Sequence, residues 1–534
     1  MFNLLHTIKH ALHLTPQSHA FRGGVHLSEF KRTATKASEQ CPMPRVLMYP
    51  VKQHIGQACE PLVKVGDRVL RGQKIGKSQG YVSVPIHAST SGIVTKIENH
   101  IIPHPSGMGL PTIFVEPDGL DEVDESLIPL PNYRSLSPVE LRERVRIAGI
   151  AGLGGAVFPT FIKLLKDKLH SIETVILNGI ECEPWLTNDH QLMLEKSHQI
   201  ITGLDIVMHM VGAQSAIVAI EDNTMDAAFV MQNAVEDMKL SQVIKVEVLP
   251  TIYPQGGEKQ LIQALTGKEV PAGRLPIHIG VLSTNVGTAK AIHDAVCLGE
   301  AMTERLVTVS GDALPSPKNM FVRFGTPVCF VLEQCGLDSC DDVNIIHGGP
   351  MMGEILRPTD IPVVKASNGL LAMKKATVMA SHHEEEPCIR CGDCSDACPA
   401  GLMPNLLAMH CKEEQFERAE NYQLFDCIEC GACSYVCPSH IPLVHYFRFG
   451  KGQVAKIRRE KVFAEESRQR SESRDLRLRK EQEEKEEKRR IAQEKKEARA
   501  AALAAQAAAA TDVADEALTE TVSEKPAPTP KAES

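Results

Sequence analysis

Two identically spaced groups of cysteines constrain this sequence more than any other feature. They lie at residues 388–399 and 427–438, and both follow the pattern CxxCxxCxxxCP. Three thiolates at this spacing surround part of a cubane iron–sulfur cluster, whereas the fourth, before proline, turns towards the other cluster. Structural zinc, the alternative, is usually bound by two CxxC pairs. The spacing therefore favours a ferredoxin-like domain that holds two [4Fe–4S] clusters.

The same motif predicts which cysteines bind each cluster, because the fourth cysteine of each run crosses to the other cluster. The predicted ligands of cluster one are Cys388, Cys391, Cys394 and Cys437. The predicted ligands of cluster two are Cys398, Cys427, Cys430 and Cys433. Two such clusters in one domain pass single electrons, so we expect an electron-transfer function.

The remaining cysteines and the apolar segments bear on the cellular compartment. The N-terminus does not have the pattern of a signal peptide. The longest weakly charged apolar stretch is residues 206–220, which is shorter than the roughly 20 residues that a membrane-spanning helix needs. We therefore expect a reducing, cytosolic location, which argues against a disulfide framework. Eight of the 16 cysteines keep no assigned chemistry, and Cys411 among them is expected to be a buried thiol. A net charge of -9 gives no support for nucleic-acid binding.

The 534 residues allow about three or four domains, and the first is expected at residues 1–130. From residue 46 to residue 98, short valine-rich runs alternate with glycine turns, which indicates a small antiparallel barrel or sandwich. The order resembles the hammerhead fold, a barrel-sandwich hybrid, of biotinyl and lipoyl carrier domains. The turn at residues 78–80 offers no clear equivalent of the lysine that is modified in those carriers. We therefore expect a structural relative without the swinging arm.

Residues 131–295 are predicted to form a Rossmann-like domain. Ser137, followed by proline and then by Glu140, marks the start of a helix. Apolar, β-branched runs at residues 174–177, 216–220 and 246–249 have the length of buried strands, and helical segments separate them. This alternation is typical of an α/β domain with a largely parallel sheet.

The rest of the chain divides into three predicted parts. Residues 296–360 carry strand-like runs around one helix, in the pattern of a β-grasp (SLBB-like) module, and residues 361–450 form the ferredoxin-type domain. Residues 451–534 are a charged, Ala-rich tail, predicted to be helical over residues 456–510 if ordered and disordered beyond. Its mixed charges favour a solvated helix, and the alternative interpretation is an arm that docks on a partner. The expected fold class is thus multidomain α/β and α+β.

Loops at the expected strand ends of the Rossmann-like domain suggest a nucleotide site. Residues 152–163 contain a glycine loop followed by Lys163, and backbone amides in such a loop can approach a phosphate that a lysine neutralises. Residues 178–184 and 253–258 follow buried strands, where α/β sheets bind ligands.

These loops, together with residues 284–288, resemble in sequence and order the FMN- and NADH-binding segments of the flavoprotein subunit of respiratory complex I. The wider arrangement adds the hammerhead, the Gly-Gly segment at residues 23–26 and the double ferredoxin motif. Over residues 20–450 it resembles the C subunit of the Rnf (Rsx) electron transport complex.

The resemblance implies the residues of the cofactor site. Those expected around the FMN phosphate and the nucleotide are Gly152, Gly154, Gly155 and Lys163. Those expected along the flavin are Asn178, Glu181, Tyr253, Gly256 and Asn285. Those expected nearer the nicotinamide nucleotide are Glu183 and Glu258.

The resemblance also implies an activity. It implies a translocase or oxidoreductase subunit that passes electrons from NADH, through FMN and two [4Fe–4S] clusters, to ferredoxin or another redox partner such as a redox-sensor protein. It further implies membrane-embedded and peripheral partner subunits, coupling to ion translocation, and a peripheral position on the cytoplasmic side of the cell inner membrane.

Two other interpretations remain open from the sequence. Ile180, Gly257 and Thr284 replace an acidic residue, a glutamate and an asparagine of the flavoprotein pattern. The chain could therefore be a non-catalytic iron–sulfur wire or scaffold with a degenerate nucleotide site. It could also be a soluble dehydrogenase that has no membrane partners.

Overall fold

The computed structural model describes residues 21–104, 106–165, 170–341, 343–356, 360–380 and 384–519. The chain forms two compact units, Met1–Lys451 and Gly452–Ser534. Within the described ranges, none of the helices combines the length and the apolar composition that crossing a membrane requires.

The N-terminal part of the first unit is a sandwich of two antiparallel sheets. One sheet has the order β2-β8-β7-β4 and the other β3-β5-β6. Leu47, Tyr49, Ile75 and Ile113 fill the space between them. The predicted sandwich is present, but the runs expected at residues 63–67 and 82–85 lie in loops between strands, and the sandwich extends past residue 98 because β8 completes the first sheet. The strands are β2 (Leu47–Pro50), β3 (Glu60–Pro61), β4 (Arg68–Val69), β5 (Lys74–Lys77), β6 (Ile86–His87), β7 (Gly92–Ile101) and β8 (Gly109–Pro117).

The predicted α/β domain contains a four-stranded, all-parallel sheet with the order β11-β10-β9-β12. Because β12 lies on the opposite side of β9 from β10, the direction of winding reverses between β9 and β12. Their carboxyl ends therefore form a topological switch point, where open α/β sheets bind ligands. The strands are β9 (Thr174–Gly179), β10 (Ser215–Glu221), β11 (Ile244–Leu249) and β12 (Val281–Asn285).

Helices cover this sheet, and their ends follow the expected sequence signals. Ser137 caps α2 with the predicted capping box, in which its hydroxyl and the Glu140 side chain satisfy each other's backbone amides. The helices are α2 (Pro138–Ile147), α3 (Thr160–Lys163), α4 (Asn188–Val211), α5 (Met225–Asp237), α6 (Glu258–Thr266) and α7 (Val286–His293), with the short turns η1 (Tyr133–Ser135), η2 (Pro276–Ile279) and η3 (Asp294–Leu298).

A six-stranded sheet follows, and it differs from the self-contained unit expected at residues 296–360. Its order is β1-β14-β13-β17-β15-β16. The edge strand β1 comes from the N-terminal segment, and β17, between β13 and β15, comes from residues assigned to the ferredoxin-type domain. The expected boundary at residue 360 is therefore too early. The elements are β1 (Glu39–Gln40), β13 (Glu304–Ser310), β14 (Lys318–Arg323), α8 (Val328–Glu333), β15 (Val343–His347), β16 (Glu354–Leu356) and β17 (Gly369–Lys374).

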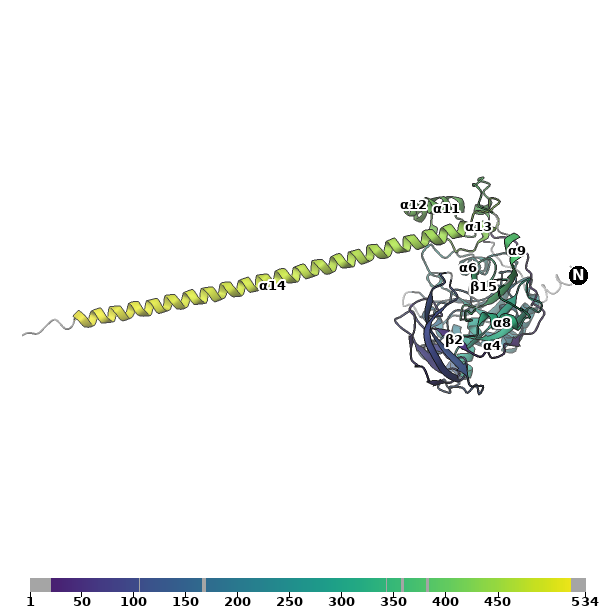
Figure 1. Ribbon diagram of the computed structural model, residues 1–534, viewed down its shortest axis with the longest axis horizontal. Coiled ribbons are helices and arrows are strands. Elements are labelled where there is room, and N and C mark those ends of the chain that lie inside the picture. Colours follow the sequence, from purple (N-terminus) through teal and green to yellow (C-terminus); the bar gives the residue numbers. More distant parts are fainter. Residues whose placement is uncertain are drawn as a thin grey trace, which may run out of the picture. The chain divides into compact units, whose positions relative to one another are not determined.

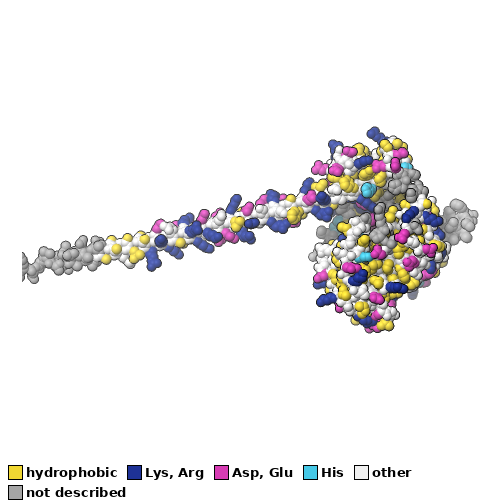
Figure 2. Space-filling model, viewed as in Figure 1, with side chains coloured by type: hydrophobic (Ala, Val, Ile, Leu, Met, Phe, Trp, Pro, Cys, Tyr) yellow, Lys and Arg dark blue, Asp and Glu magenta, His cyan; other side chains and the backbone are white. Residues whose placement is uncertain are grey.

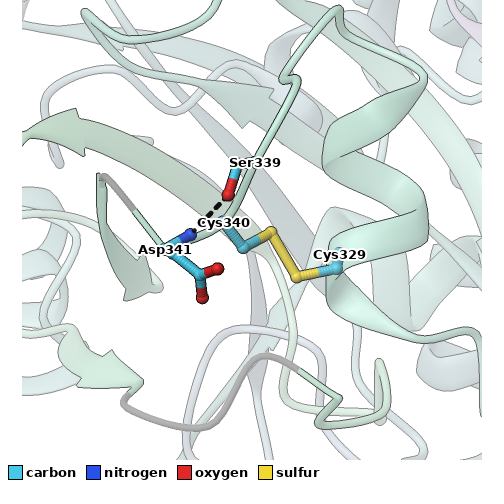
Figure 3. Close-up of a disulfide and its surroundings, with 4 residues drawn as sticks. All are labelled: Cys329, Ser339, Cys340 and Asp341. Atoms are coloured by element: carbon cyan, nitrogen blue, oxygen red, sulfur yellow. Dashed lines mark hydrogen bonds between the residues drawn. A yellow bond between two sulfur atoms is a disulfide. The ribbon is translucent and has the colours of Figure 1, made fainter.

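One disulfide joins α8 to the loop before β15. It links Cys329 to Cys340, and the Ser339 hydroxyl beside it accepts a hydrogen bond of 3.1 Å from the Asp341 amide (Figure 3). This bond corrects the expectation from a reducing location, which argues against a disulfide framework. A spacing of eleven residues has no metal or redox signature, so the sequence gives neither cysteine a role.

The cysteine-rich part consists of short helices and loops around a small core. Leu407, Cys411, Leu424 and Phe447 are buried there, which confirms the expectation of a buried Cys411 thiol. The helices are α9 (Lys375–Ala380), α10 (Asp393–Asp396), α11 (Pro404–Lys412), α12 (Phe416–Asn421), η4 (Leu424–Asp426) and α13 (Ala432–Tyr435).

The second unit is a single long helix, the distal part of α14 (Leu443–Thr519) (Figure 1). Basic and acidic side chains alternate along much of its surface (Figure 2), and Arg468 pairs with both Glu465 and Glu472. The predicted helix over residues 456–510 is present. The disorder predicted beyond residue 510 is wrong as far as Thr519, because no proline interrupts the Ala-rich run before that point. Residues 520–534 lie outside the described ranges.

Candidate cofactor sites

Two asparagines meet at the switch point of the parallel sheet. Asn178, in β9, and Asn285, the last residue of β12, are direct partners in the register of the two strands. The Asn178 amide nitrogen donates to the Gly256 carbonyl at 2.9 Å, and its oxygen accepts from the Ile180 amide at 3.0 Å. Three of the predicted flavin residues, Asn178, Gly256 and Asn285, therefore lie together at one sheet edge.

The glycine loop is anchored over Asn285. The Asn285 oxygen caps α7 by accepting from the Gly287 amide at 2.9 Å, and its nitrogen donates to Asp189 at 2.6 Å. A Cβ added at Gly154 would lie 3.4 Å from the Asn285 Cβ, and the Leu153 amide donates to the Thr288 hydroxyl at 2.9 Å. The loop thus contacts the switch point through its backbone.

The free side of this loop can accommodate a ligand. Gly155 has a φ of +104°, and a Cβ added there would meet no described atom within 4 Å. The Gly152 amide closes the base of the loop on the Phe158 carbonyl at 2.9 Å. Lys163 forms an ion pair with Glu258, and both side chains are more than one third exposed. A phosphate at this loop would meet backbone amides and an accessible ammonium group.

Two buried polar atoms in the predicted site segments, residues 152–163 and 253–258, lack a partner in the described part of the chain. They are the Thr160 hydroxyl, at the start of α3, and the side-chain oxygen of Gln255. Buried polar atoms are normally hydrogen-bonded, so a bound group with donors and acceptors would supply the hydrogen bonds that these two atoms lack. The backbone cradle, the paired asparagine amides and these open atoms fit FMN, which carries both a phosphate and a polar ring edge.

Backbone amides of the protein itself donate to the carboxylates of Glu181 and Glu183. Glu181 accepts from the Asp189 amide at 3.0 Å, and Glu183 accepts from the Met351 and Met352 amides at 3.0 Å and 2.9 Å. Burial raises the pKa of Glu181 and of Glu183 to about 7.

Sequence reasoning missed Lys31, which holds the same loop from the N-terminal segment. Its ammonium group donates to the carbonyls of Glu181, Glu183 and Leu186 at 2.6, 3.1 and 2.7 Å. A small cavity next to it is also lined by Cys182 and Tyr253. No sequence motif identifies Lys31, because its hydrogen-bond partners are backbone carbonyls about 150 residues away in the chain.

The cysteines predicted for cluster two surround one cavity. Apolar groups, among them Val444 and Phe447, complete its lining. Burial raises the pKa of Cys430 to about 12, and the nearby thiolates add to burial in raising the pKa of Cys433. Thiols that are crowded and desolvated in this way need the compensating charge of bound metal to ionise. The four that line the cavity are Cys398, Cys427, Cys430 and Cys433.

The cysteines predicted for cluster one lie nearer the surface. Cys388 and Cys391 are exposed, Cys394 is buried, and Cys437 is intermediate. Burial raises the pKa of Cys394, and the neighbouring Cys437 and Cys391 add to the shift, so these three thiols share one neighbourhood.

Neither group is arranged around a single ion. Within the described residues, no three His, Cys, Asp or Glu side chains converge to hold one metal ion. A [4Fe–4S] cluster, in contrast, is bound at separate iron atoms, so its four thiolates surround a cluster and do not converge on one point.

Three family models match separate parts of the chain. They are the RnfC barrel sandwich hybrid domain at residues 19–120, the Nuo51 FMN-binding domain at residues 145–294 and the 4Fe-4S dicluster domain at residues 381–461. These matches confirm the predicted N-terminal hybrid and the predicted cofactors, FMN and [4Fe–4S] clusters, and they reject structural zinc.

Curated relatives match most of the chain. The C subunit of the ion-translocating oxidoreductase complex of Yersinia pestis bv. Antiqua (strain Antiqua) is 44% identical over 463 residues, which cover 86% of this chain and 74% of that protein. The protein of the same name from Pseudomonas aeruginosa is 43% identical over 465 residues, covering 87% of this chain and 59% of that protein.

Among solved structures, an NAD+-reducing [NiFe]-hydrogenase in the H2-reduced state matches 60% of this chain and 64% of its own, with a TM-score of 0.45 and 17% identity. Similarity of that degree supports no conclusion about function. The long match to the curated relatives does, and it agrees with all three family models. This chain belongs to the family of C subunits of ion-translocating oxidoreductase complexes.

Proposed function

We propose that this chain is the electron-input subunit of a membrane-bound complex, and that it takes electrons from NADH and passes them on one at a time while the complex translocates ions. The family supports the general role, since its members are ion-translocating oxidoreductase subunits. The observation that carries the site is the pairing of Asn178 with Asn285 at the switch point, with Gly154 packed on Asn285.

The residues at this edge have separable tasks. The amides of residues 152–155 and the Lys163 ammonium group would hold the phosphate of FMN. Asn178, fixed by the Gly256 carbonyl, and Asn285, fixed by Asp189, would hold the polar edge of the ring. When bound, FMN supplies the conversion between the two-electron oxidation of NADH and one-electron transfer.

Glu258 is the acidic residue best placed for the nicotinamide nucleotide. It begins α6 next to Gly256 and is partly exposed, whereas Glu181 and Glu183 are engaged by backbone amides. A carboxylate at this point could accept hydrogen bonds from ribose hydroxyls. Its ion pair with Lys163 would then open when the nucleotide binds.

The proposed partners follow from the family. They are the membrane-embedded and peripheral subunits of the same complex, on the cytoplasmic side of the cell inner membrane, and a ferredoxin or a redox-sensor protein that exchanges electrons with the complex. The chain itself would be peripheral and would attach through those subunits.

A second candidate is an iron–sulfur wire without NADH oxidation. The specific observation in its favour is that the Lys163 ammonium group is already paired with Glu258, and that backbone amides already donate to Glu181 and Glu183. In this version the flavin domain would serve only as a scaffold for the clusters.

An anaerobic NADH titration of the purified protein, with flavin analysis, separates the two candidates. Electron input predicts about one bound FMN and bleaching of the iron–sulfur absorbance on addition of NADH. The wire predicts clusters that dithionite reduces and NADH does not. Absence of both flavin and NADH-dependent reduction would sink the electron-input proposal.

A further inference from the structure

We propose that two buried cations at the base of the glycine loop, Lys365 and Arg305, are positioning residues for the flavin phosphate. They are here called the cation pair. They hold the backbone of the loop, and their charge makes the site prefer the phosphorylated flavin, FMN, over riboflavin. This inference rests on the proposed function, because it takes the amides of residues 152–155 as the place of the phosphate.

Lys365, in the segment before β17, holds the backbone just before the glycine loop. Its ammonium group donates to the Gly149 carbonyl at 2.6 Å and to the Pro85 carbonyl at 3.3 Å. Gly149 has a φ of +73°, and a Cβ added there would lie 2.7 Å from the Pro85 oxygen, so the two segments are in close contact. Lys365 therefore joins the barrel-sandwich hybrid, which carries Pro85, to the start of the loop.

Arg305, in β13, holds the loop itself. Its guanidinium group donates to the Leu153 carbonyl at 3.2 Å and to the Lys365 carbonyl. Its Nε atom is buried and has no hydrogen-bond partner in the described part of the chain. Because Arg305 binds the backbone of Lys365 and each cation binds one end of residues 149–153, the two act on the loop as one unit.

Both cations are shielded from water. Lys365 is 1% exposed and Arg305 is 5% exposed. Apolar packing closes the region, since Val84 of the hybrid forms a buried cluster with Ala151 and Val157 of the flavin domain. Placing a charge in such surroundings is costly unless an opposite charge compensates it.

The described residues supply little negative charge to the cation pair. The hydrogen bonds of both cations within the described ranges go to backbone carbonyls, and neither cation forms an ion pair there. Asp189 and Glu181 attract Arg305 from beyond ion-pair distance. Their carboxylates already accept hydrogen bonds from Asn285 and from the Asp189 amide, respectively. The compensation of Arg305 is therefore partial.

The titratable side chains around Lys365 are neutral. Burial lowers the pKa of His87 to about 3 and also lowers the pKa of His54, and the charge of Lys365 adds to both shifts. Burial raises the pKa of the Cys59 thiol, which therefore stays protonated. Burial lowers the pKa of Lys365 to about 8, so its ammonium group is still mostly charged at pH 7. Positive charge without a carboxylate partner thus lies at the base of the glycine loop.

A phosphate on the open side of the loop would supply the missing negative charge. A phosphate monoester carries about two negative charges at neutral pH. Lys163 is partly exposed and already paired with Glu258, so water screens its charge more than that of the buried cation pair. Riboflavin has the same ring as FMN but no phosphate, so the charge of the pair would not favour its binding. The cation pair would therefore determine which flavin the site accepts.

Binding of FMN and of riboflavin to the full-length protein, after its flavin has been removed, tests the cation pair. The readout is the ratio of the two affinities, measured by flavin fluorescence. Lys365→Met should weaken FMN binding roughly tenfold more than riboflavin binding, because only FMN carries the charge that Lys365 attracts. Lys318→Met is the matched control, since it removes a lysine of β14 that pairs with Glu39 at 2.8 Å, and it should leave the ratio unchanged.

Two variants of Arg305 separate its charge from its hydrogen bonds. Arg305→Met removes both, and it should lower the ratio of FMN affinity to riboflavin affinity. Arg305→Lys keeps the charge but loses the forked contact with two carbonyls. Both flavins should then bind more weakly, while the ratio should stay close to that of the wild type. The unfolding midpoint and the iron–sulfur absorbance show that each variant has folded.

The outcomes separate this inference from the proposed function. Equal weakening of FMN and riboflavin in Lys365→Met and Arg305→Met would show that the pair only supports the loop, and would overturn its role in selecting FMN. Unchanged affinities for both flavins would overturn the positioning role as well. If Lys365→Met does not fold, the two Arg305 variants decide. If NADH does not reduce the bound flavin of the wild type, the proposed function fails, while the affinity ratio still decides on the cation pair.

Discussion

Three buried glutamates cluster behind the switch point. Glu181, Glu183 and Glu221 follow or end adjacent strands, and burial raises the pKa of each to about 7. The Lys31 ammonium group lies among them and opposes these shifts. The sequence predicted Glu181 along the flavin and Glu183 nearer the nicotinamide nucleotide, but it could not show what holds this loop. The loop is held by Lys31 and by the amides of residues 351–352, which are distant in the chain.

Replacing Glu221 by glutamine should stabilise the flavin domain at neutral pH. The raised pKa means that the native state keeps its proton between about pH 4.3 and pH 7 while the unfolded chain loses it, so the wild-type protein loses stability as the pH rises through that window. Glu221→Gln removes this loss, and its advantage over the wild type should grow from pH 5.5 to pH 8, to as much as about 3 kcal/mol.

Thermal unfolding followed by flavin release, measured at several pH values, checks this prediction. Glu269→Gln changes an exposed glutamate of the same domain and should show no such pH-dependent gain. A constant difference between Glu221→Gln and wild type across the range would contradict the assignment.

Asn285 combines a structural and a binding role, which two substitutions separate. Asn285→Ala removes the cap of α7 and should cost about 1 kcal/mol as well as flavin affinity. Asn285→Asp keeps the capping oxygen but places a carboxylate against Asp189, where the wild-type amide donates at 2.6 Å.

The Asp variant keeps the cap but should lose more stability than the Ala variant, because two carboxylates within hydrogen-bond distance repel each other, and it should also lose flavin. Bound FMN per protein and the unfolding midpoint are the two readouts, with Asn132→Ala, at an exposed position without a side-chain cap, as the control. Full flavin occupancy in both Asn285 variants would show that this side chain does not hold the cofactor.

At the scale of elements, α4 and α7 pack unusually closely at one glycine. A Cβ added at Gly203 would lie 1.9 Å from the Ala289 carbonyl oxygen, which is backbone and cannot move away alone. Gly203→Ala should therefore separate the helices at a cost of about 3 kcal/mol, near the upper range for overpacking. Because α7 carries Asn285 at its start, flavin occupancy should fall as well.

Chemical denaturation together with flavin analysis measures both effects. Gly452→Ala is the matched helical control, since a Cβ there meets no described atom within 4 Å and alanine is the better helix former. Equal stability of the two variants would mean that α4 and α7 adjust without strain.

The elements were predictable to different degrees. The parallel strands and α2 could be read from apolar runs and a capping box, since both signals lie within one segment. The six-stranded sheet could not, because β1 and β17 are short and join it from outside the expected unit. Leu370 and Leu371 in β17 have no alternating pattern, and only their burial against β13 and β15 makes them a strand.

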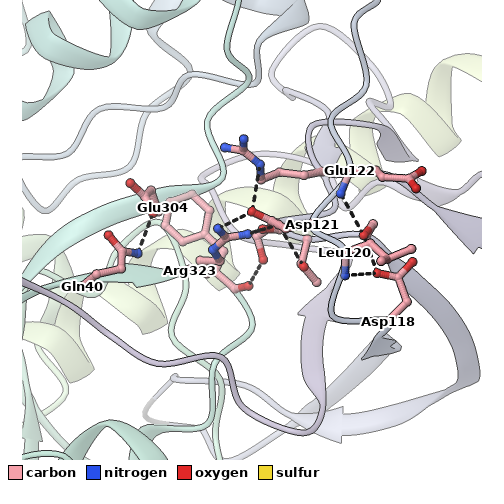
Figure 4. A network of polar contacts seen from close by, with 12 residues as sticks. Gln40, Asp118, Leu120, Asp121, Glu122, Glu304 and Arg323 are labelled. Carbon is pink, nitrogen blue, oxygen red and sulfur yellow. Dashed lines mark hydrogen bonds and ion pairs between the residues drawn. The ribbon is translucent and has the colours of Figure 1, made fainter.

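At the scale of the whole first unit, an ionic network joins the barrel-sandwich hybrid to the six-stranded sheet. Arg323, in β14, donates to Asp121 at 2.5 Å and 2.8 Å and to the Ser89 carbonyl at 2.6 Å (Figure 4). Gln40 and Glu304 lie in the same region and pair at 3.1 Å. This network fixes two units that the sequence treats as separate domains.

Breaking the network should weaken the hybrid's attachment. Arg323→Met leaves the partly buried Asp121 with only Arg71, at 3.4 Å, as a cation, and should cost about 1–3 kcal/mol, between surface and buried ion pairs. A double-mutant cycle with Asp121→Asn isolates the pair. Arg68→Met, which removes an exposed arginine paired with Asp118 and Glu122, should cost less. A coupling energy of zero for Arg323 and Asp121 would contradict this view.

The long helix should be dispensable for the cofactor sites. Residues 456–510 are exposed along their whole length, and the contacts that build both sites lie within the first unit. A chain shortened after Glu460 should retain FMN and both clusters and lose mainly helical circular dichroism at 222 nm. Loss of either cofactor in the shortened chain would assign the helix a role in folding the first unit.

The sequence by itself determined the kind of metal centre, the parallel sheet with its glycine loop, and the long charged helix. Each of these depends on spacing within one segment, which the chain carries without reference to its partners. Tertiary structure alone decided that Lys31 holds the loop of Glu181 and that Tyr253 contacts Cys430. It also decided that Cys329 meets Cys340 and that β17 completes a sheet begun at β13. Those contacts depend on packing between segments that are not neighbours in the chain, or on the direction of a turn, and neither is encoded in local spacing.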